Sequence, residues 1–147
     1  MRRYLWDGHI LSCEQTRDIV MQSVALYMER GYGLWGAFDS AGSLVGFCGY
    51  WSFRDEHELE LLYGVAEPDW LKGYAREMVE PMIAYGFEHL QLPEIRASID
   101  APNGASQRVL RRQGFLNDSV RNLAGGKLYF RLPRERRETD SEGWEAA

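Results

Sequence analysis

The sequence contains little cysteine, since Cys13 and Cys48 are the only two among 147 residues. They fall in a predicted helix and a predicted strand, and neither has neighbours with the spacing of metal ligands. We therefore expect two reduced thiols, no disulfide and no metal site. Long apolar runs are also absent, because none approaches the roughly eighteen residues that a membrane span requires.

An excess of positive charge is missing as well. The formal net charge is -5, whereas proteins that bind nucleic acid usually carry a basic face. Residues 1–5 lack the apolar core of a signal peptide. These absences predict a cytoplasmic protein without nucleic-acid or membrane partners. With 45% hydrophobic and 27% charged residues, the chain can bury one substantial core, which predicts a single domain.

Helix and strand patterns alternate in the first half of the chain. Residues 12–15 resemble a capping box, and a helix is predicted over residues 14–30. Its apolar positions recur at helical spacing: Ile19, Val20, Val24, Tyr27 and Met28. Apolar, aromatic-rich runs then predict strands over residues 34–38 and 44–51, joined by a turn at residues 39–43. A return strand over residues 58–65 follows.

The second half continues the alternation. A helix is predicted over residues 74–90, with Pro81 inside it removing one hydrogen bond. Further predicted elements are a strand at residues 94–99, a short helix at residues 105–112, and a hairpin of residues 116–120 and 127–132. The order of helix, three strands, helix, strand, helix and two strands predicts an α/β fold.

The most informative segment is Trp70-Leu71-Lys72-Gly73-Tyr74-Ala75, between a predicted strand and a predicted helix. The start of a helix has free N–H groups and the positive end of the helix dipole, so it favours phosphate oxygens. Gly73 allows a close approach of the backbone, and Ala75 is small. About thirty residues later comes Asn103-Gly104-Ala105-Ser106, and then Gln113-Gly114-Phe115.

Together these segments resemble the signatures of the GNAT superfamily of acyl-CoA-dependent N-acetyltransferases, most closely the branch with the ribosomal-protein alanine N-acetyltransferases. The superfamily's pyrophosphate loop reads Arg/Gln-x-x-Gly-x-Gly/Ala, and the branch often has Trp-Gly-Lys-Gly-Tyr-Ala-x-Glu. Residues 70–77 read Trp-Leu-Lys-Gly-Tyr-Ala-Arg-Glu. The branch's later Asn-x-x-Ser and Gly-Phe are matched by Asn103, Ser106, Gly114 and Phe115. The likeness extends over residues 5–132.

This resemblance implies a mixed, mostly antiparallel central sheet flanked by helices, splayed to hold acetyl-CoA as co-substrate. It places the pyrophosphate at residues 70–75. The pantetheine arm would meet the backbone of Tyr63, Gly64 and Val65, where one N–H would polarise the thioester carbonyl. Asn103 would bind the pantetheine amides, and Arg112, with Arg111 beside it, could reach the nucleotide phosphates.

The resemblance also suggests the catalytic groups. Glu60 is the candidate general base, with Glu58, His57 or water as alternatives; Glu58 and Glu60 could also simply line a solvent face. Many GNAT enzymes have a tyrosine acid seven residues after the asparagine, but that position here is Leu110. Ser106 or solvent would protonate the leaving thiolate, although Ser106 could instead be a helix-terminal hydrogen-bonding residue.

The expected reaction is direct attack of a primary amine on acetyl-CoA. Acidic residues at 55–60, with Trp51 and Phe53 nearby, favour a cationic acceptor. By resemblance, peptide or protein N-termini are the first candidate acceptors, and polyamines and aminoglycosides are the next candidates. The alternative is a non-catalytic acyl-CoA-binding or interaction module.

Two expectations concern the ends of the chain. The branch's usual first strand and first helix have no counterpart here, so residues 34–38 would form an open edge that a homodimer or residues 2–11 would cover. We expect the acetyltransferase domain over residues 1–133. Residues 134–147 are charged and lack apolar periodicity, which predicts a solvated tail.

Overall fold

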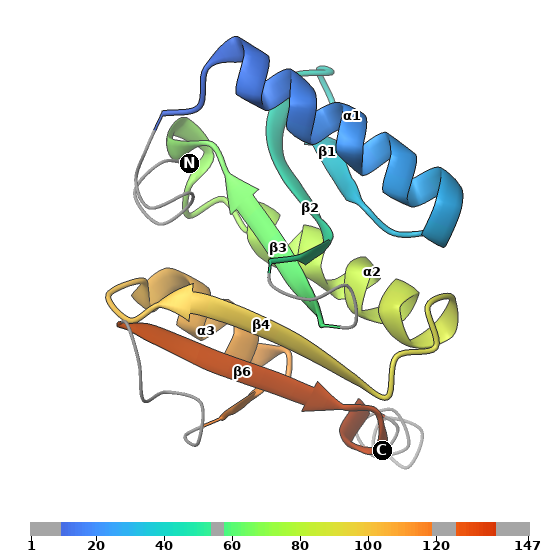
Figure 1. The fold of residues 1–147 in the computed structure, drawn as a ribbon. Coiled ribbons are helices and arrows are strands. Elements are labelled where there is room, and N and C mark those ends of the chain that lie inside the picture. Colours follow the sequence, from blue (N-terminus) through green and yellow to red (C-terminus); the bar gives the residue numbers. More distant parts are fainter. Residues whose placement is uncertain (1–9, 54–57, 119–125, 138–147) are drawn as a thin grey trace. The chain divides into compact units, whose positions relative to one another are not determined.

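The computed structural model describes residues 10–53, 58–118 and 126–137. The chain divides into two compact units, Met1–Met82 and Ile83–Ala147, with the boundary inside helix α2 (Tyr74–Glu88). Each unit contains three antiparallel strands together with helical elements (Figure 1). The predicted fold class, α/β with mostly antiparallel strands flanked by helices, is confirmed.

The first unit is built on the strand order β1-β2-β3. Its elements are α1 (Cys13–Arg30), β1 (Leu34–Phe38), β2 (Leu44–Ser52), β3 (Leu59–Val65), the 3-10 helix η3 (Glu67–Asp69) and the first part of α2. The predicted turn between β1 and β2 is confirmed. The Asp39 carboxylate accepts hydrogen bonds from the N–H groups of Ala41 and Ser43 at 2.9 and 2.8 Å. These bonds form the local turn that returns the chain antiparallel.

Helix α2 packs on one face of β2 and β3. The buried Tyr50 hydroxyl donates to the carbonyl of Met82 at 2.7 Å, which ties β2 to this helix. Tyr50 pairs with Leu61, and Gly46 pairs with Val65, so these residues share the α2 face because paired residues point to the same side. A Cβ on Gly46 would lie 2.3 Å from the Gly64 carbonyl oxygen, so the close approach of β2 and β3 requires glycine there.

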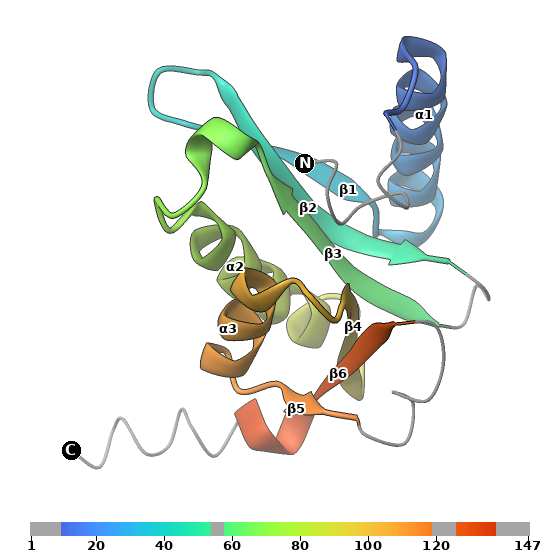
Figure 2. The ribbon, with the colours of Figure 1, turned by 90° about the vertical axis from the view of Figure 1, so that its left-hand side faces the viewer.

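Helix α1 confirms its predicted start but not its predicted apolar face. Ser12 and Gln15 form the reciprocal capping box. The side chains at the apolar positions Val20, Val24 and Met28 are exposed, and Ser23 is the buried residue of the helix. Its hydroxyl donates to the Leu34 carbonyl at 3.1 Å and accepts from the Leu34 N–H at 2.7 Å. A polar contact therefore attaches this helix to β1. Figure 2 shows the helix next to that strand.

The second unit has the strand order β4-β6-β5. It comprises the rest of α2, β4 (Glu94–Asp100), α3 (Gly104–Arg112), β5 (Leu116–Asn117) and β6 (Lys127–Pro133). Strand β6 is antiparallel to both neighbours, which confirms the predicted hairpin of β5 and β6. The core contains apolar side chains from helices and strands: Ile83, Phe87, Ile95, Leu110, Phe130 and Leu132.

The first residues of the predicted C-terminal tail form a short helix. Residues 134–137 are helical, and the Arg134 guanidinium donates to the carbonyls of Phe87 and Leu92 at 2.8 and 3.2 Å. It also lies 5.4 Å from the centre of the Phe87 ring. Arg134 thus packs within the second unit, because its guanidinium satisfies one carbonyl in the last turn of α2 and one that follows the helix. Residues 138–147 lie outside the described residues, and a single domain over residues 1–133 stays a prediction.

Candidate acetyl-CoA site

The predicted pyrophosphate loop has two residues with left-handed backbone. Leu71 has φ of 64° and Gly73 has φ of 85°. Turns that include left-handed residues can direct successive N–H groups toward one side, where they suit an anion. A Cβ built on Gly73 would meet nothing within 4 Å. Glycine there suits the backbone conformation and leaves the space above the loop open.

The first turn of α2 adds hydrogen-bond donors next to this loop. The first bond into the helix runs from the Glu77 N–H to the Gly73 carbonyl at 3.2 Å. The N–H groups of Tyr74, Ala75 and Arg76 precede it, and the described part of the chain supplies no acceptor for them. Unpaired donors at the positive end of a helix dipole favour an anion. The unpaired donors of these residues suit the predicted pyrophosphate.

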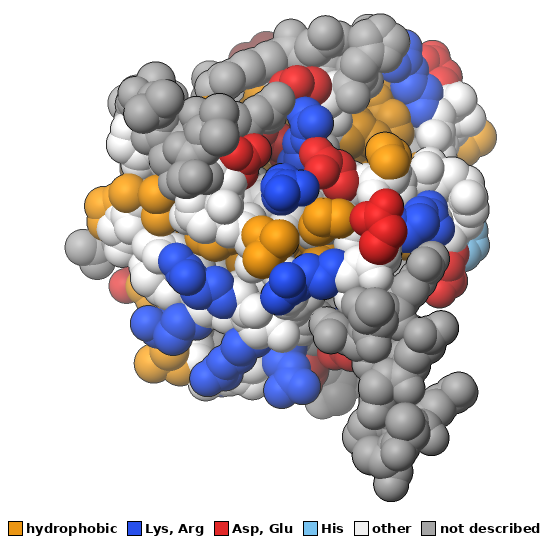
Figure 3. Space-filling model, turned by 90° about the horizontal axis from the view of Figure 1, so that it is seen from below, with side chains coloured by type: hydrophobic (Ala, Val, Ile, Leu, Met, Phe, Trp, Pro, Cys, Tyr) orange, Lys and Arg blue, Asp and Glu red, His pale blue; other side chains and the backbone are white. Residues whose placement is uncertain are grey.

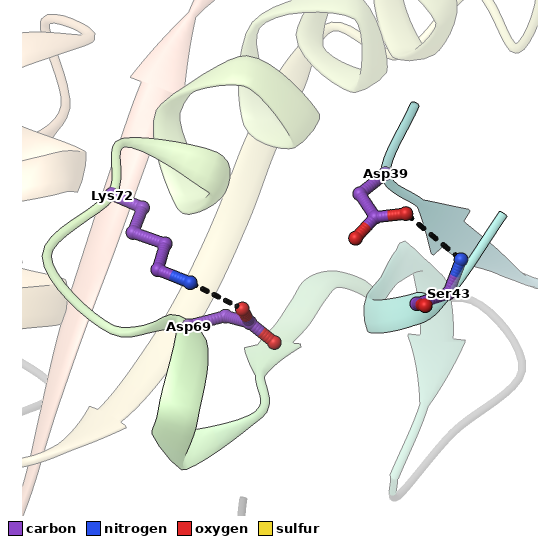
Figure 4. Close-up of polar contacts among 4 residues, drawn as sticks. All are labelled: Asp39, Ser43, Asp69 and Lys72. Atoms are coloured by element: carbon purple, nitrogen blue, oxygen red, sulfur yellow. Dashed lines mark hydrogen bonds and ion pairs between the residues drawn. The ribbon is translucent and has the colours of Figure 1, made fainter. Parts of the chain in front are cut away.

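Lys72 is held by a neighbouring carboxylate and does not project freely from the loop. Its ammonium lies 2.9 Å from Asp69 (Figure 4). The hydrogen bond and charge of Asp69 raise the pKa of Lys72, with a smaller contribution from Asp39. Phosphate binding at this loop would therefore depend chiefly on backbone N–H groups. Helix η3, which carries Asp69, was not predicted, although Pro68 near its start is a usual signal for a helix N-terminus.

The end of β3 directs alternate peptide groups to opposite sides. The Ala66 N–H donates to the Val45 carbonyl at 2.8 Å, and the register continues through the pair Gly64 and Phe47. In an antiparallel ladder, the residues between such pairs direct their N–H and C=O groups the other way. Tyr63 and Val65 thus direct their N–H groups away from β2, whereas Gly64 faces β2. The predicted donor to the thioester carbonyl is a backbone N–H of Gly64 or Val65. The N–H of Val65 points away from β2 and is free of that strand, whereas the N–H of Gly64 points toward β2.

Glu60 lies on the face of β3 opposite to α2. It is paired with Trp51, and it is one residue from Leu61, which shares the α2 face with Tyr50. Its side chain is half-buried. Glu58 precedes β3 and is not part of the strand, while the competing base His57 and the acidic residues 55 and 56 lie outside the described residues.

Asn103 and Ser106 are joined at the start of α3 in the second unit. The Asn103 side-chain oxygen accepts from the Ser106 N–H at 3.2 Å and caps the helix. The Asn103 amide N–H groups have no acceptor among the described residues and suit a ligand carbonyl. Leu110 is fully buried, so the position of the usual tyrosine acid belongs to the core.

Arginines at the end of α3 differ in their surroundings. Both Arg111 and Arg112 are exposed, and the guanidinium of Arg111 lies 5.7 Å from the centre of the buried Phe130 ring. Figure 3 shows that Lys and Arg side chains gather on the face seen from below Figure 1. Within the described ranges, no three His, Cys, Asp or Glu side chains are grouped to hold a metal ion, and no described helix is long and apolar enough to cross a membrane.

Comparison with known proteins decides the family. A model of the acetyltransferase (GNAT) domain matches residues 1–116. The chain belongs to the GNAT acetyltransferase family. It is 30% identical over 120 residues to the uncharacterized N-acetyltransferase YoaA of Bacillus subtilis, which covers 80% of this chain and 68% of that protein. Across three curated relatives, the aligned part spans 53% to 68% of their length.

Solved structures agree in fold with this GNAT chain. The acetyltransferase of Agrobacterium tumefaciens superposes with a TM-score of 0.72 at 23% identity, covering 87% of this chain and 76% of that one. The ribosomal-protein-S5-alanine acetyltransferase of Vibrio fischeri superposes with a TM-score of 0.68 at 19% identity, covering 83% and 72%. At these identities the similarity establishes the fold.

Proposed function

We propose that this GNAT protein transfers an acetyl group from acetyl-CoA to a primary amine by direct attack. The observation that carries the proposal is the left-handed loop at Leu71 and Gly73, followed by the unpaired N–H groups at the start of α2. This arrangement suits the pyrophosphate of a CoA thioester, which is the acetyl donor of the family.

The remaining residues take roles that their chemistry supports. The Val65 N–H polarises the thioester carbonyl, and Asn103 binds the pantetheine amides through its side-chain N–H groups. Arg112 contacts the nucleotide phosphates. Glu60 accepts the proton of the attacking amine, and Ser106 or solvent returns one to the CoA thiolate. In this reaction the C–N bond of the product forms and the C–S bond of acetyl-CoA breaks. No covalent intermediate on the protein is needed.

The acceptor is a cationic amine in this proposal. Glu58 precedes β3 and Glu60 is its second residue, and neighbouring carboxylates raise the local concentration of cations. Peptide or protein N-termini are the first candidates, because the V. fischeri protein of similar fold is named for the ribosomal protein S5 alanine that it acetylates. Polyamines and aminoglycosides come next. The electrostatic argument applies equally to these three classes.

Release of free thiol from acetyl-CoA tests this function. The protein is incubated with acetyl-CoA and a panel of N-terminal peptides, polyamines, aminoglycosides and acidic amino acids, and CoA thiol is quantified. We expect release with at least one cationic amine, together with thermal stabilisation by CoA through mass action. Gly73→Val should abolish that stabilisation, because its Cβ branch would occupy the space above the loop. Stabilisation without turnover would favour the non-catalytic binding module. No stabilisation at millimolar CoA would refute both the acetyltransferase and the binding module.

Substitution of Glu60 tests its role as base. Glu60→Gln should lower kcat by roughly ten- to a thousandfold and remove the acidic limb of the pH profile, because a general base is lost. CoA affinity should stay near that of the unmodified protein. A variant with full turnover would reassign the base to Glu58, His57 or water.

We also propose that the protein forms a homodimer through the open edge of β1. The side chains of Phe38 and Leu44 next to this edge are 65% and 57% exposed, which supports an association surface. The alternative cover, residues 2–11, lies almost wholly outside the described residues. The cytoplasmic location stays a prediction.

A further inference from the structure

Trp70 connects the two parts of the first unit that the proposed function assigns to acetyl-CoA. Its indole N–H donates to the Val65 carbonyl at 2.9 Å, across five residues of sequence. Its side chain does not belong to the core, since the residue is 42% exposed. A contact made by an exposed ring depends more on the hydrogen bond than on buried apolar area.

The Val65–Ala66 peptide is held from both sides by this contact. The Val65 carbonyl accepts from Trp70, and the Ala66 N–H donates to the Val45 carbonyl at 2.8 Å. Both groups of this peptide are therefore engaged, and its orientation is fixed. Val65 is also the residue whose N–H points away from β2, toward the side on which the thioester carbonyl is proposed to bind.

The other end of the connection lies at the start of the pyrophosphate loop. The Trp70 backbone N–H donates to the Glu67 carbonyl at 3.2 Å, and Leu71 and Gly73 with their left-handed backbones follow directly. The indole thus sets the separation between the end of β3 and the loop. Fixing two binding elements before the ligand arrives lowers the ordering cost of binding.

We propose that Trp70 is a positioning residue for acetyl-CoA, because its indole N–H holds the Val65 carbonyl and thereby holds the pyrophosphate loop in register with the end of β3. The inference rests on the proposed function. It differs from a purely structural role in what it predicts: loss of the donor should affect CoA binding more than the thermal stability of the free protein.

Three substitutions separate the hydrogen bond from the ring. Trp70→Gln keeps an N–H donor, Trp70→Met has nearly the same length as glutamine without a donor, and Trp70→Phe keeps an aromatic ring without a donor. Trp35→Phe, on β1 and outside the proposed site, is the matched control. The Kd of CoA is measured by calorimetry, KM for acetyl-CoA and for the amine by thiol release, and Tm without ligand.

We expect Trp70→Met and Trp70→Phe to weaken CoA binding by about threefold to tenfold, the usual worth of one hydrogen bond. KM for acetyl-CoA should rise in parallel, KM for the amine should stay constant, and Trp70→Gln should recover most of the affinity. Affinity equal to that of the unmodified protein in both donor-free variants would overturn the inference, and so would an equal loss in all three. An unmodified protein that does not bind CoA would refute the proposed function itself.

Discussion

Leu71 has a backbone conformation that favours glycine, and its side chain is 95% exposed. The resembled branch often has glycine at this position, where the left-handed conformation carries no Cβ penalty. The exposed side chain has little packing to offset that penalty. Leu71 therefore stores local strain in a loop proposed to bind phosphate.

Leu71→Gly should stabilise the protein by about 0.5 to 1 kcal/mol, because relief of the left-handed strain exceeds the entropy that glycine loses on folding. Leu71→Ala is the control, since alanine keeps the strain and removes only the exposed side chain. Denaturant unfolding measures both. A glycine variant no more stable than the alanine variant would contradict this interpretation.

The buried thiol of Cys48 should make the free energy of unfolding depend on pH. Burial raises the pKa of its thiol from 9.0 to about 12. The folded state thus disfavours the thiolate, and stability that is complete below pH 9 should be lost as the pH rises toward 12, with a slope of about 1.4 kcal/mol per pH unit. Cys48→Ala should reduce this slope between pH 9 and 10, whereas alanine at the exposed Cys13 should not. Equal slopes for the two variants in denaturant unfolding would contradict the prediction.

At the scale of elements, α1 depends on a polar contact at a close approach. A Cβ added to Gly33 would lie 2.7 Å from both the carbonyl oxygen and the hydroxyl of Ser23. The helix therefore lies directly against the chain at the start of β1. The Ser23 hydroxyl then satisfies the Leu34 N–H and C=O, which point away from β2 because Gly33 bonds to Tyr50 on the other side.

Ser23→Ala should destabilise the protein by about 1 to 3 kcal/mol, because it leaves a backbone N–H and C=O in a partly buried site without partners. Gln22→Ala, at an exposed neighbouring position of the same helix, is the control and should change the free energy of unfolding little. The two are compared by denaturant unfolding and by amide exchange at Leu34. Equal stability of the two variants would show that α1 does not depend on this contact.

At the scale of the whole molecule, apolar side chains remain exposed along α1 and beside β1. The rings of Tyr27 and Trp35 pack edge to face with 5.8 Å between their centres, so α1 and β1 also share an aromatic contact. Scattered exposed apolar residues are ordinary, whereas the exposed Phe38 and Leu44 are paired beside the edge of β1, which supports the proposed association surface.

We expect a homodimer in light scattering, and we expect Phe38→Lys or Leu44→Lys to convert it to a monomer by placing charge at the edge. Phe53→Lys is the control, since Phe53 is exposed beyond the end of β2. A monomeric unmodified protein with slow amide exchange along β1 would instead indicate cover by residues of its own chain. A monomer with fast exchange there would contradict both forms of cover.

Local patterns in the sequence determined most elements of this protein. The capping box of α1, the turn at Asp39, the Pro-containing α2 and the start of that helix at Tyr74 were predictable, because each depends on residues within a few positions of one another. The loop at Gly73 was predictable for the same reason. Its positive φ and its place before a helix follow from local chemistry.

Only the tertiary structure decided which surfaces these elements bury and how the site residues are held. The apolar spacing of α1 suggested a buried apolar face, yet Ser23 is the buried residue of the helix, because its hydroxyl bonds the N–H and C=O of Leu34. The direction of the Val65 N–H depends on the register with β2, and the partners of Trp70 and Lys72 depend on where η3 turns the chain. Such contacts depend on position in space, which local residue patterns do not encode.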